Sequence, residues 1–156
     1  MEFKKVTTNM PEYLKSLELR NLVLRKPLGL DIKDDDLTKE PLAAHFVAVE
    51  GEKVIGTLFL MPDDNKDYQM KQVAVDPEHQ GKAIGKRLVE TAETWAIQQQ
   101  GSSRIWLHAR QNAWPFYKKS GYHFISETYR QVGIIHKTME KRLNSCKPDA
   151  EKIDYK

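Results

Sequence analysis

The sequence predicts one domain of the α/β class, in which strands and helices alternate along the chain. Its 156 residues are enough for one core that buries roughly two thirds of the unfolded surface. Short apolar runs rich in β-branched residues alternate with stretches whose apolar residues recur at three- and four-residue steps. No segment is repeated. With 40% hydrophobic and 30% charged residues, the composition is that of an ordinary globular protein.

The N-terminal third is expected to hold a strand, a helix and a polar loop. Residues 3–8 predict the strand. Leucines at near-helical spacing predict a helix that starts at Pro11 and that Pro27 and Gly29 end. The acidic stretch 31–41 is too polar for the core, so we expect a solvated loop there, with a lid or substrate-selecting loop as the alternative.

The rest of the chain continues the alternation. Two apolar runs on either side of residues 50–53 predict a β-hairpin, and residues 68–75 predict another strand. Residues 84–100 predict a helix, with Gly101 where a left-handed cap would fall. The remaining predicted elements are a strand at 104–109, a short helix at 111–121 that Asn112 can cap, and strands at 122–129 and 132–143.

Composition and charge exclude several classes of protein. The formal charge of +3 is too small to indicate a nucleic-acid partner, although it suits an anionic ligand. No apolar run could span a membrane, and residues 1–10 lack the apolar core of a signal peptide. The single Cys146 has no disulfide partner, so we expect a cytoplasmic protein. Five scattered histidines show no metal-ligand spacing, and we expect no metal.

The stretch VAVDPEHQGKAIGKRL, residues 73–88, joins a predicted strand to a predicted helix. The first turn of a helix has backbone N–H groups without intrahelical acceptors and a partial positive charge. Gly81 and Gly85 leave these groups uncovered, and Lys82 and Lys86 add charge, so the stretch predicts an anion cradle. The alternative is a tight turn with solvated lysines. The spacing is neither that of a Walker loop nor Gly-x-Gly-x-x-Gly.

The segment Gln80-Gly81-Lys82-Ala83-Ile84-Gly85 resembles the acetyl-CoA-binding motif of the GNAT N-acetyltransferase superfamily, Gln/Arg-x-x-Gly-x-Gly/Ala. Residues 112–124, NAWPFYKKSGYHF, are similar to the second signature of that family. The order of elements from residue 3 to about 143 fits as well, and LRNLVLRKPLG, HFVAV and VGIIHKTM are similar to the ElaA-like branch. Ala83 departs from the motif, because it places a methyl group where the family has its central glycine.

The resemblance implies an α/β fold of the GNAT type, with a central, splayed, mainly antiparallel mixed sheet flanked by helices. It implies one acetyltransferase domain over residues 1–143, followed by a polar tail at 144–156. The implied activity is transfer of an acetyl group from acetyl-CoA to a primary amine, by direct attack in a ternary complex. The alternatives are a catalytically weak CoA-binding sensor or regulatory module, and an interaction domain. The coenzyme A contacts that the resemblance implies are Val73, Val75, Gln80, Gly81, Lys82, Ala83, Gly85, Lys86 and Asn112.

By the same resemblance, Tyr117 is the general acid that meets the departing sulfur of coenzyme A. Full proton transfer from a phenol to a thiolate is uphill by roughly 2 kcal/mol at their ordinary pKa values, so a strong hydrogen bond is the alternative. The candidates for the general base are His108, then Glu127 and His136. An N–H near Val73 would polarise the thioester carbonyl.

The acceptor side is less defined by sequence. Arg20 and Arg25 are expected to be solvated or to face the acceptor cleft, and His45 and His79 to lie at the surface. The expected partner is a small-molecule or peptide amine, and the resemblance allows a homodimer.

Overall fold

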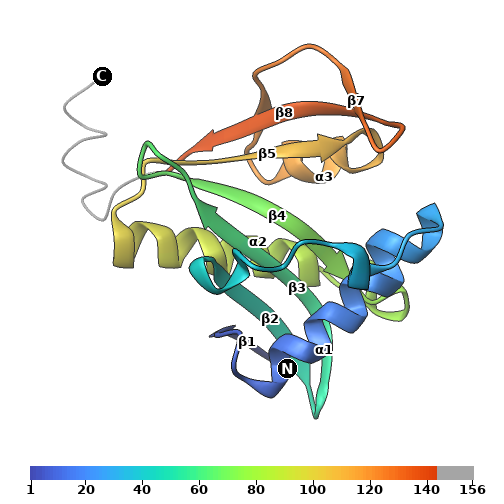
Figure 1. Ribbon diagram of the computed structural model, residues 1–156. Coiled ribbons are helices and arrows are strands. Elements are labelled where there is room, and N and C mark those ends of the chain that lie inside the picture. Colours follow the sequence, from blue (N-terminus) through green and yellow to red (C-terminus); the bar gives the residue numbers. More distant parts are fainter. Residues whose placement is uncertain (144–156) are drawn as a thin grey trace. The chain divides into compact units, whose positions relative to one another are not determined.

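The computed structural model describes residues 1–143, and the predicted tail at 144–156 with Cys146 lies outside them (Figure 1). The strands are β1 (Glu2–Val6), β2 (Ala44–Glu50), β3 (Lys53–Pro62), β4 (Tyr68–Val75), β5 (Arg104–Arg110), β6 (His123–Phe124), β7 (Tyr129–Gln131) and β8 (Ile134–Arg142). The α-helices are α1 (Pro11–Arg20), α2 (Ile84–Trp95) and α3 (Trp114–Lys119).

The strands form an open mixed sheet that confirms the predicted fold class. The strand order is β1-β2-β3-β4-β5-β8-β6, with β7 paired to β8. The β1–β2, β2–β3, β5–β8, β6–β8 and β7–β8 pairs are antiparallel. The β4–β5 pair is parallel, with Tyr68 opposite Ile105 and Gln69 opposite Trp106. The expected splay of these two strands stays a prediction.

The chain divides into two compact units. Residues 1–62 and 70–92 form unit 1, and residues 63–69 and 93–143 belong to unit 2. The expectation of a single domain over residues 1–143 stays a prediction, and each unit is described by itself below.

In unit 1, α1 and the start of α2 cover opposite faces of the sheet formed by β1, β2 and β3 (Figure 1). A β-bulge between Ala48 and Val49 shifts the register, so residues on either side of it can share a face. The buried cluster beneath α1 consists of Val6, Leu19, Val47, Val54 and Ala74. The hairpin between β2 and β3 turns at Gly51, with φ 64°, as its sequence predicts.

The face beneath α2 depends on a glycine. A Cβ added at Gly56 would lie 2.7 Å from Leu88 Cδ1 and 3.0 Å from Ile84 Cγ2. Only a residue without a side chain therefore lets the first turns of α2 pack this closely on β3. This contact fixes where α2 begins relative to the strand.

The predicted leucine face of α1 is only partly correct. Leu14 is 64% exposed and Leu22, in the π turn Asn21–Arg25 that continues the helix, is 46% exposed. The buried side chains of α1 are instead Tyr13, Ser16, Leu19 and Arg20. The face of this helix that meets the sheet is therefore largely polar.

In unit 2, ion pairs join the strands. The Arg104 guanidinium lies 3.2 Å from Asp67 and 2.6 Å from Glu140. The predicted strand at 122–129 is wrong in extent, because only His123–Phe124 and Tyr129–Gln131 pair with β8.

Candidate active site

The segment between β4 and α2 passes twice through left-handed backbone. Gly81 has φ 85° and Ala83 has φ 62°. Helix α2 begins at Ile84, so the amides of its first turn lack intrahelical acceptors, and the first helical bond runs from Arg87 N to Ala83 O at 3.1 Å. The turn is exposed to solvent. This is the geometry of an anion site at a helix N-terminus.

One lysine lies within this turn and another in the first turn of α2. Lys82 and Lys86 are both exposed, as expected of charges available to a phosphate. The nearby Arg87 instead stacks on the ring of Phe3, with its guanidinium carbon 4.3 Å from the ring centroid.

The start of the turn is held by side chains. Gln80 donates from Nε2 to the carbonyl oxygen of Val75 at 3.1 Å. Asp76 accepts a hydrogen bond from the backbone N–H of Glu78 at 2.9 Å, and its own N–H donates to the carbonyl of Ile55 at 2.8 Å. Gln80 therefore stabilises the turn through its side chain. The expected contact of Gln80 with the cofactor is a separate role, and the two are compatible.

Strand β4 carries a distortion that its sequence does not predict. Gln72 has φ 56°, a left-handed conformation that costs a residue with a side chain about 1–3 kcal/mol. Val73 and Val75, the expected cofactor contacts, follow it and are half-buried. The available signal was a polar residue in the alternation Tyr68, Met70, Gln72, Ala74, whose other three members are buried.

A buried polar network lies behind this distortion. Arg20 is 1% exposed and donates from Nε to Oε1 of Gln72 at 2.8 Å. Its two terminal nitrogens donate to the two oxygens of Glu40 at 2.8 and 2.6 Å. The expectation that Arg20 is solvated or faces an acceptor cleft is therefore wrong. The loop expected at residues 31–41 is exposed over much of its length, but Ile32 and Glu40 are buried in it.

Two further groups complete the network. The Tyr13 hydroxyl donates a hydrogen bond to Glu40 Oε1 at 2.7 Å. Burial raises the pKa of Tyr13, and this hydrogen bond raises it further. His45 is 2% exposed and its Nε2 lies 2.8 Å from the carbonyl oxygen of Glu40, so the predicted surface position is wrong. Burial opposes ionisation of Glu40, but the hydrogen bonds from Arg20 and Tyr13 outweigh it and lower the pKa of that carboxyl.

Tyr117 lies in unit 2, on α3. Its side chain is 6% exposed and packs edge-on against Phe116 and Tyr122, with ring centroids 4.9 and 5.9 Å away. Burial raises the pKa of Tyr117 above that of an ordinary phenol, with a smaller opposing effect of Arg110. The hydroxyl therefore stays protonated at neutral pH and can serve as a hydrogen-bond donor.

The short helix α3 begins without a side-chain cap. Its N-cap is Ala113, so the expectation that Asn112 caps it is wrong. Asn112 is exposed, in the 3-10 turn Gln111–Ala113 that precedes the helix. Pro115 lies in the first turn as predicted, because its missing N–H needs no partner there.

His108 belongs to a polar cluster on β5, β7 and β8. Its Nδ1 lies 2.6 Å from the hydroxyl of Tyr129, which lies 2.9 Å from Oγ1 of Thr138. His136 is 4% exposed and stacks on Tyr129 with an interplanar angle of 16°. Glu127 is exposed in the loop before β7. His108 can therefore exchange a proton with a neighbouring hydroxyl, whereas His136 is buried against the ring of Tyr129.

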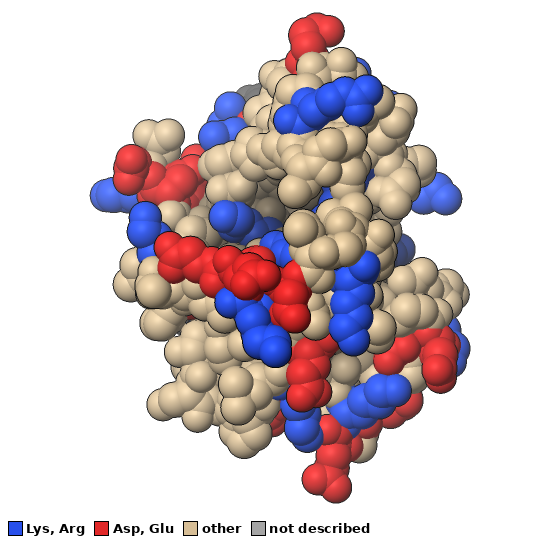
Figure 2. All heavy atoms as spheres, turned by 45° about the vertical axis from the view of Figure 1, so that its right-hand side comes forward, with Lys and Arg blue, Asp and Glu red and all other residues tan. Residues whose placement is uncertain are grey.

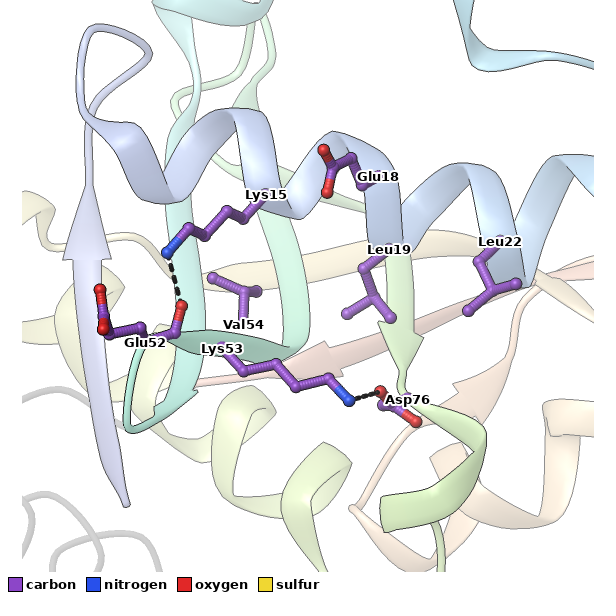
Figure 3. A pocket seen from close by; sticks show the side chains of 8 residues that line it. All are labelled: Lys15, Glu18, Leu19, Leu22, Glu52, Lys53, Val54 and Asp76. Carbon is purple, nitrogen blue, oxygen red and sulfur yellow. Dashed lines mark hydrogen bonds and ion pairs between the residues drawn. The ribbon is translucent and has the colours of Figure 1, made fainter.

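A hollow of about 510 Å³ lies in unit 1, beside α1 (Figure 3). Its wall combines apolar side chains with two charged contacts, from Lys15 to the carbonyl oxygen of Glu52 and from Lys53 to Asp76 at 3.2 Å. The lining residues of the hollow are Lys15, Glu18, Leu19, Leu22, Glu52, Lys53, Val54 and Asp76.

Arg25, which like Arg20 is expected to be solvated or to face an acceptor cleft, instead forms an ion pair with Asp35 at 2.8 Å.

Charges of both signs share the face shown in Figure 2, and neither sign covers it alone. Among residues 1–143, no group of three or more His, Cys, Asp or Glu side chains is arranged to hold a metal ion. Over the same part of the chain, every helix is too short or too polar to cross a membrane.

The predicted site residues fall into two groups. Val73, Val75 and residues 80–86 come together in unit 1, where β4 leads into α2. His108, Asn112 and Tyr117 come together in unit 2, along β5, the following turn and α3.

Comparisons with known proteins identify a family for this chain. The model of the acetyltransferase (GNAT) family matches residues 11–122. The chain is 32% identical over 108 residues to the uncharacterised N-acetyltransferase YjcF of Bacillus subtilis, covering 69% of this chain and 74% of that protein.

Solved structures share the fold. Escherichia coli ElaA matches with a TM-score of 0.77 and 18% identity, over 90% of this chain and 98% of that one. An aminoglycoside 6'-N-acetyltransferase complexed with coenzyme A matches with a TM-score of 0.75 and 17% identity, over 91% and 97% of the two chains. The fold is thus that of acyl-CoA N-acyltransferases, and the expected likeness to ElaA is confirmed at the level of the fold. The chain belongs to the GNAT acetyltransferase family.

Proposed function

We propose that this protein transfers an acetyl group from acetyl-CoA to a primary amine, by direct attack in a ternary complex. The observation that carries the proposal is the exposed turn at residues 80–83, whose positive φ angles at Gly81 and Ala83 open the first-turn amides of α2 to an anion. The cofactor contacts in this proposal are Val73, Val75, Gln80, Gly81, Lys82, Ala83, Gly85, Lys86 and Asn112. The chemistry of these groups fits a diphosphate, because they supply backbone donors and two exposed lysines.

In the proposed reaction the amine nitrogen attacks the thioester carbonyl carbon. A C–N bond forms, the C–S bond breaks, the nitrogen loses a proton and the sulfur takes one or a hydrogen bond in its place. Negative charge develops on the carbonyl oxygen, which a fixed N–H donor stabilises. We assign that donor to the backbone of β4 at Val73, next to the distorted Gln72.

Tyr117 is the proposed donor to the departing sulfur. Its raised pKa makes complete proton transfer to a thiolate harder than for an ordinary phenol. A hydrogen bond that strengthens as charge develops on sulfur needs no such transfer. We therefore assign Tyr117 the role of hydrogen-bond donor rather than full acid.

The acceptor must be a neutral amine when it attacks. Deprotonating a lysine-like amine at pH 7 costs roughly 4.6 kcal/mol, whereas an α-amine with a pKa near 8 costs only about 1.4 kcal/mol. We assign proton removal to His108, whose Nδ1 is in contact with the Tyr129 hydroxyl. The expected small-molecule or peptide acceptor, the homodimer and the cytoplasmic location stay predictions.

The test is a panel of free amines incubated with acetyl-CoA and the purified protein. We expect release of coenzyme A thiol that depends on one class of amine, together with an acetylated product detected by mass spectrometry. Binding of acetyl-CoA without turnover on any amine would favour the sensor or regulatory module. Absence of acetyl-CoA binding would overturn both, and a rise in melting temperature with the ligand measures that binding.

A further inference from the structure

The backbone of β4 is distorted at one residue that carries a side chain. Gln72 has φ 56°, between residues of the strand that are not left-handed. Glycine would adopt this angle freely, but glutamine does so only where its surroundings hold it there. The next residue is Val73, whose backbone N–H is the proposed donor to the thioester carbonyl.

The side chain of Gln72 is held by a single buried cation. Arg20 Nε donates to Gln72 Oε1 at 2.8 Å, across 52 positions of sequence. The two terminal nitrogens of Arg20, Nη1 and Nη2, donate in parallel to the two carboxylate oxygens of Glu40, at 2.8 and 2.6 Å. Because a guanidinium is planar, a guanidinium clamped by Glu40 presents its Nε–H in one fixed direction.

The clamp is itself fixed. Glu40 Oε1 also accepts from the Tyr13 hydroxyl at 2.7 Å, and the Arg20 guanidinium carbon lies 5.1 Å from the ring centroid of Phe59. Arg20 and Glu40 are 1% and 4% exposed, so water does not compete for these bonds. The chain of contacts from α1 to β4 therefore has little freedom.

We infer that Arg20 is a positioning residue for acyl transfer. Through Gln72 it fixes the distortion of β4, and this directs the N–H of Val73 at the carbonyl oxygen of a bound thioester. The inference rests on the proposed function. It adds that recognition of the thioester carbonyl depends on Arg20, a buried residue of α1 that does not contact the substrate. A purely structural network would stabilise the fold without distinguishing ligands that have the carbonyl from those that lack it.

The test compares two ligands that differ only at that carbonyl. Acetyl-CoA has the thioester C=O, and S-ethyl-CoA has a CH₂ group in its place. Dissociation constants for both are measured by titration calorimetry on the wild-type chain and on Gln72→Met, which removes the acceptor of Arg20 Nε. We expect the variant to bind acetyl-CoA roughly fivefold more weakly, the equivalent of one hydrogen bond, and S-ethyl-CoA within about twofold of the wild type.

Two further variants control the comparison. Gln72→Glu keeps an oxygen acceptor for Arg20 and should retain the preference for the carbonyl ligand. Gln69→Met makes the same replacement on the same strand, at a residue without positive φ, and should leave both affinities within about twofold. Arg20→Met is not needed, since loss of a buried ion pair could prevent folding.

The results separate the inference from the proposed function. Turnover of acetyl-CoA by the wild-type chain tests the proposed function alone. With turnover established, equal weakening of both ligands in Gln72→Met would show a structural role and overturn the inference. Unchanged affinities in Gln72→Met, or a wild-type chain without any preference for the carbonyl ligand, would overturn it as well.

Discussion

Arg20 and Glu40 form a bidentate ion pair, with N–O distances of 2.8 and 2.6 Å, in the interior of unit 1. Both side chains have left water, so the pair is stable only while both partners are present. Replacing Glu40 by glutamine leaves a buried guanidinium without its counter-charge. We expect Glu40→Gln to lower the free energy of unfolding by about 3–5 kcal/mol, measured by urea denaturation at pH 7.

A second pair in the same unit provides the control. Arg25 and Asp35 are also bidentate, at 3.1 and 2.8 Å, but their side chains are 17% and 19% exposed. Asp35→Asn should cost less than about 1 kcal/mol. The double variant Arg20→Met with Glu40→Leu should cost less than Glu40→Gln alone, because it leaves no unpaired buried charge. A double variant less stable than Glu40→Gln would contradict the burial argument.

The periodicity of the sequence predicted most elements but not this network. Strand alternation and helical spacing report which positions are apolar, and they located β2, β3, β4, β5 and α2. They treat Arg20 as a surface residue because charged side chains are almost never buried alone. Its partner Glu40 lies 20 positions away, inside an acidic stretch, and single-sequence patterns do not reveal contacts at that separation.

The candidate site shows the same division. The glycines and lysines of residues 80–86 are local features, so the sequence located the turn and its exposed lysines. The positive φ of Gln72 is imposed by a tertiary contact, and nothing in the local sequence requires it. The cap assigned to Asn112 was wrong by one residue, since a 3-10 turn precedes α3 and makes Ala113 the N-cap.

His45 makes stability depend on pH. Burial lowers the pKa of its imidazole, so the folded chain resists the proton that the unfolded chain accepts. The resulting stability is present above the ordinary value of about 6.5 and is lost as the pH falls below it. We expect the free energy of unfolding to fall between pH 7 and pH 5, by at most about 1.4 kcal/mol per pH unit from this group.

The measurement is urea denaturation at pH 7, 6 and 5. In His45→Gln the side-chain amide can still donate to the carbonyl of Glu40, but it cannot take up a proton. This variant should therefore show a flatter dependence on pH over that range. A slope equal to that of the wild type would assign the dependence to other groups.

Ala83 adopts φ 62° where α2 begins, an angle that favours glycine. Ala83→Gly removes the strain of the left-handed alanine and the methyl group from the proposed phosphate cradle. We expect the free energy of unfolding to rise by less than about 1 kcal/mol, because the gain exceeds the added freedom of the unfolded chain only slightly. The affinity for coenzyme A should rise in the same variant, as measured by calorimetry.

Ala92→Gly is the matched control for this substitution. Ala92 is fully buried in the interior of α2, where glycine lowers helix stability by about 1 kcal/mol and leaves a small void. The same chemical change should therefore have opposite effects at the two positions. Weaker binding of coenzyme A by Ala83→Gly would contradict the proposed cradle.

Tyr117 and Tyr122 are two buried tyrosines whose rings lie 5.9 Å apart, and only one has a proposed part in catalysis. The Tyr122 hydroxyl donates a hydrogen bond to Glu93 at 2.8 Å, so we assign Tyr122 a structural role. Tyr117→Phe should lower kcat roughly 10- to 100-fold with unchanged affinity for coenzyme A, because the lost donor acts on the departing sulfur. Tyr122→Phe should reduce stability and leave kcat unchanged.

The burial of Tyr117 also predicts how the rate depends on pH. Since burial keeps the Tyr117 phenol protonated, the wild-type rate should not decline as the pH approaches the ordinary phenol value of about 10. Steady-state kinetics of the three proteins between pH 7 and pH 10 measure both effects, and equal losses of kcat in the two variants would exclude Tyr117 as the specific donor.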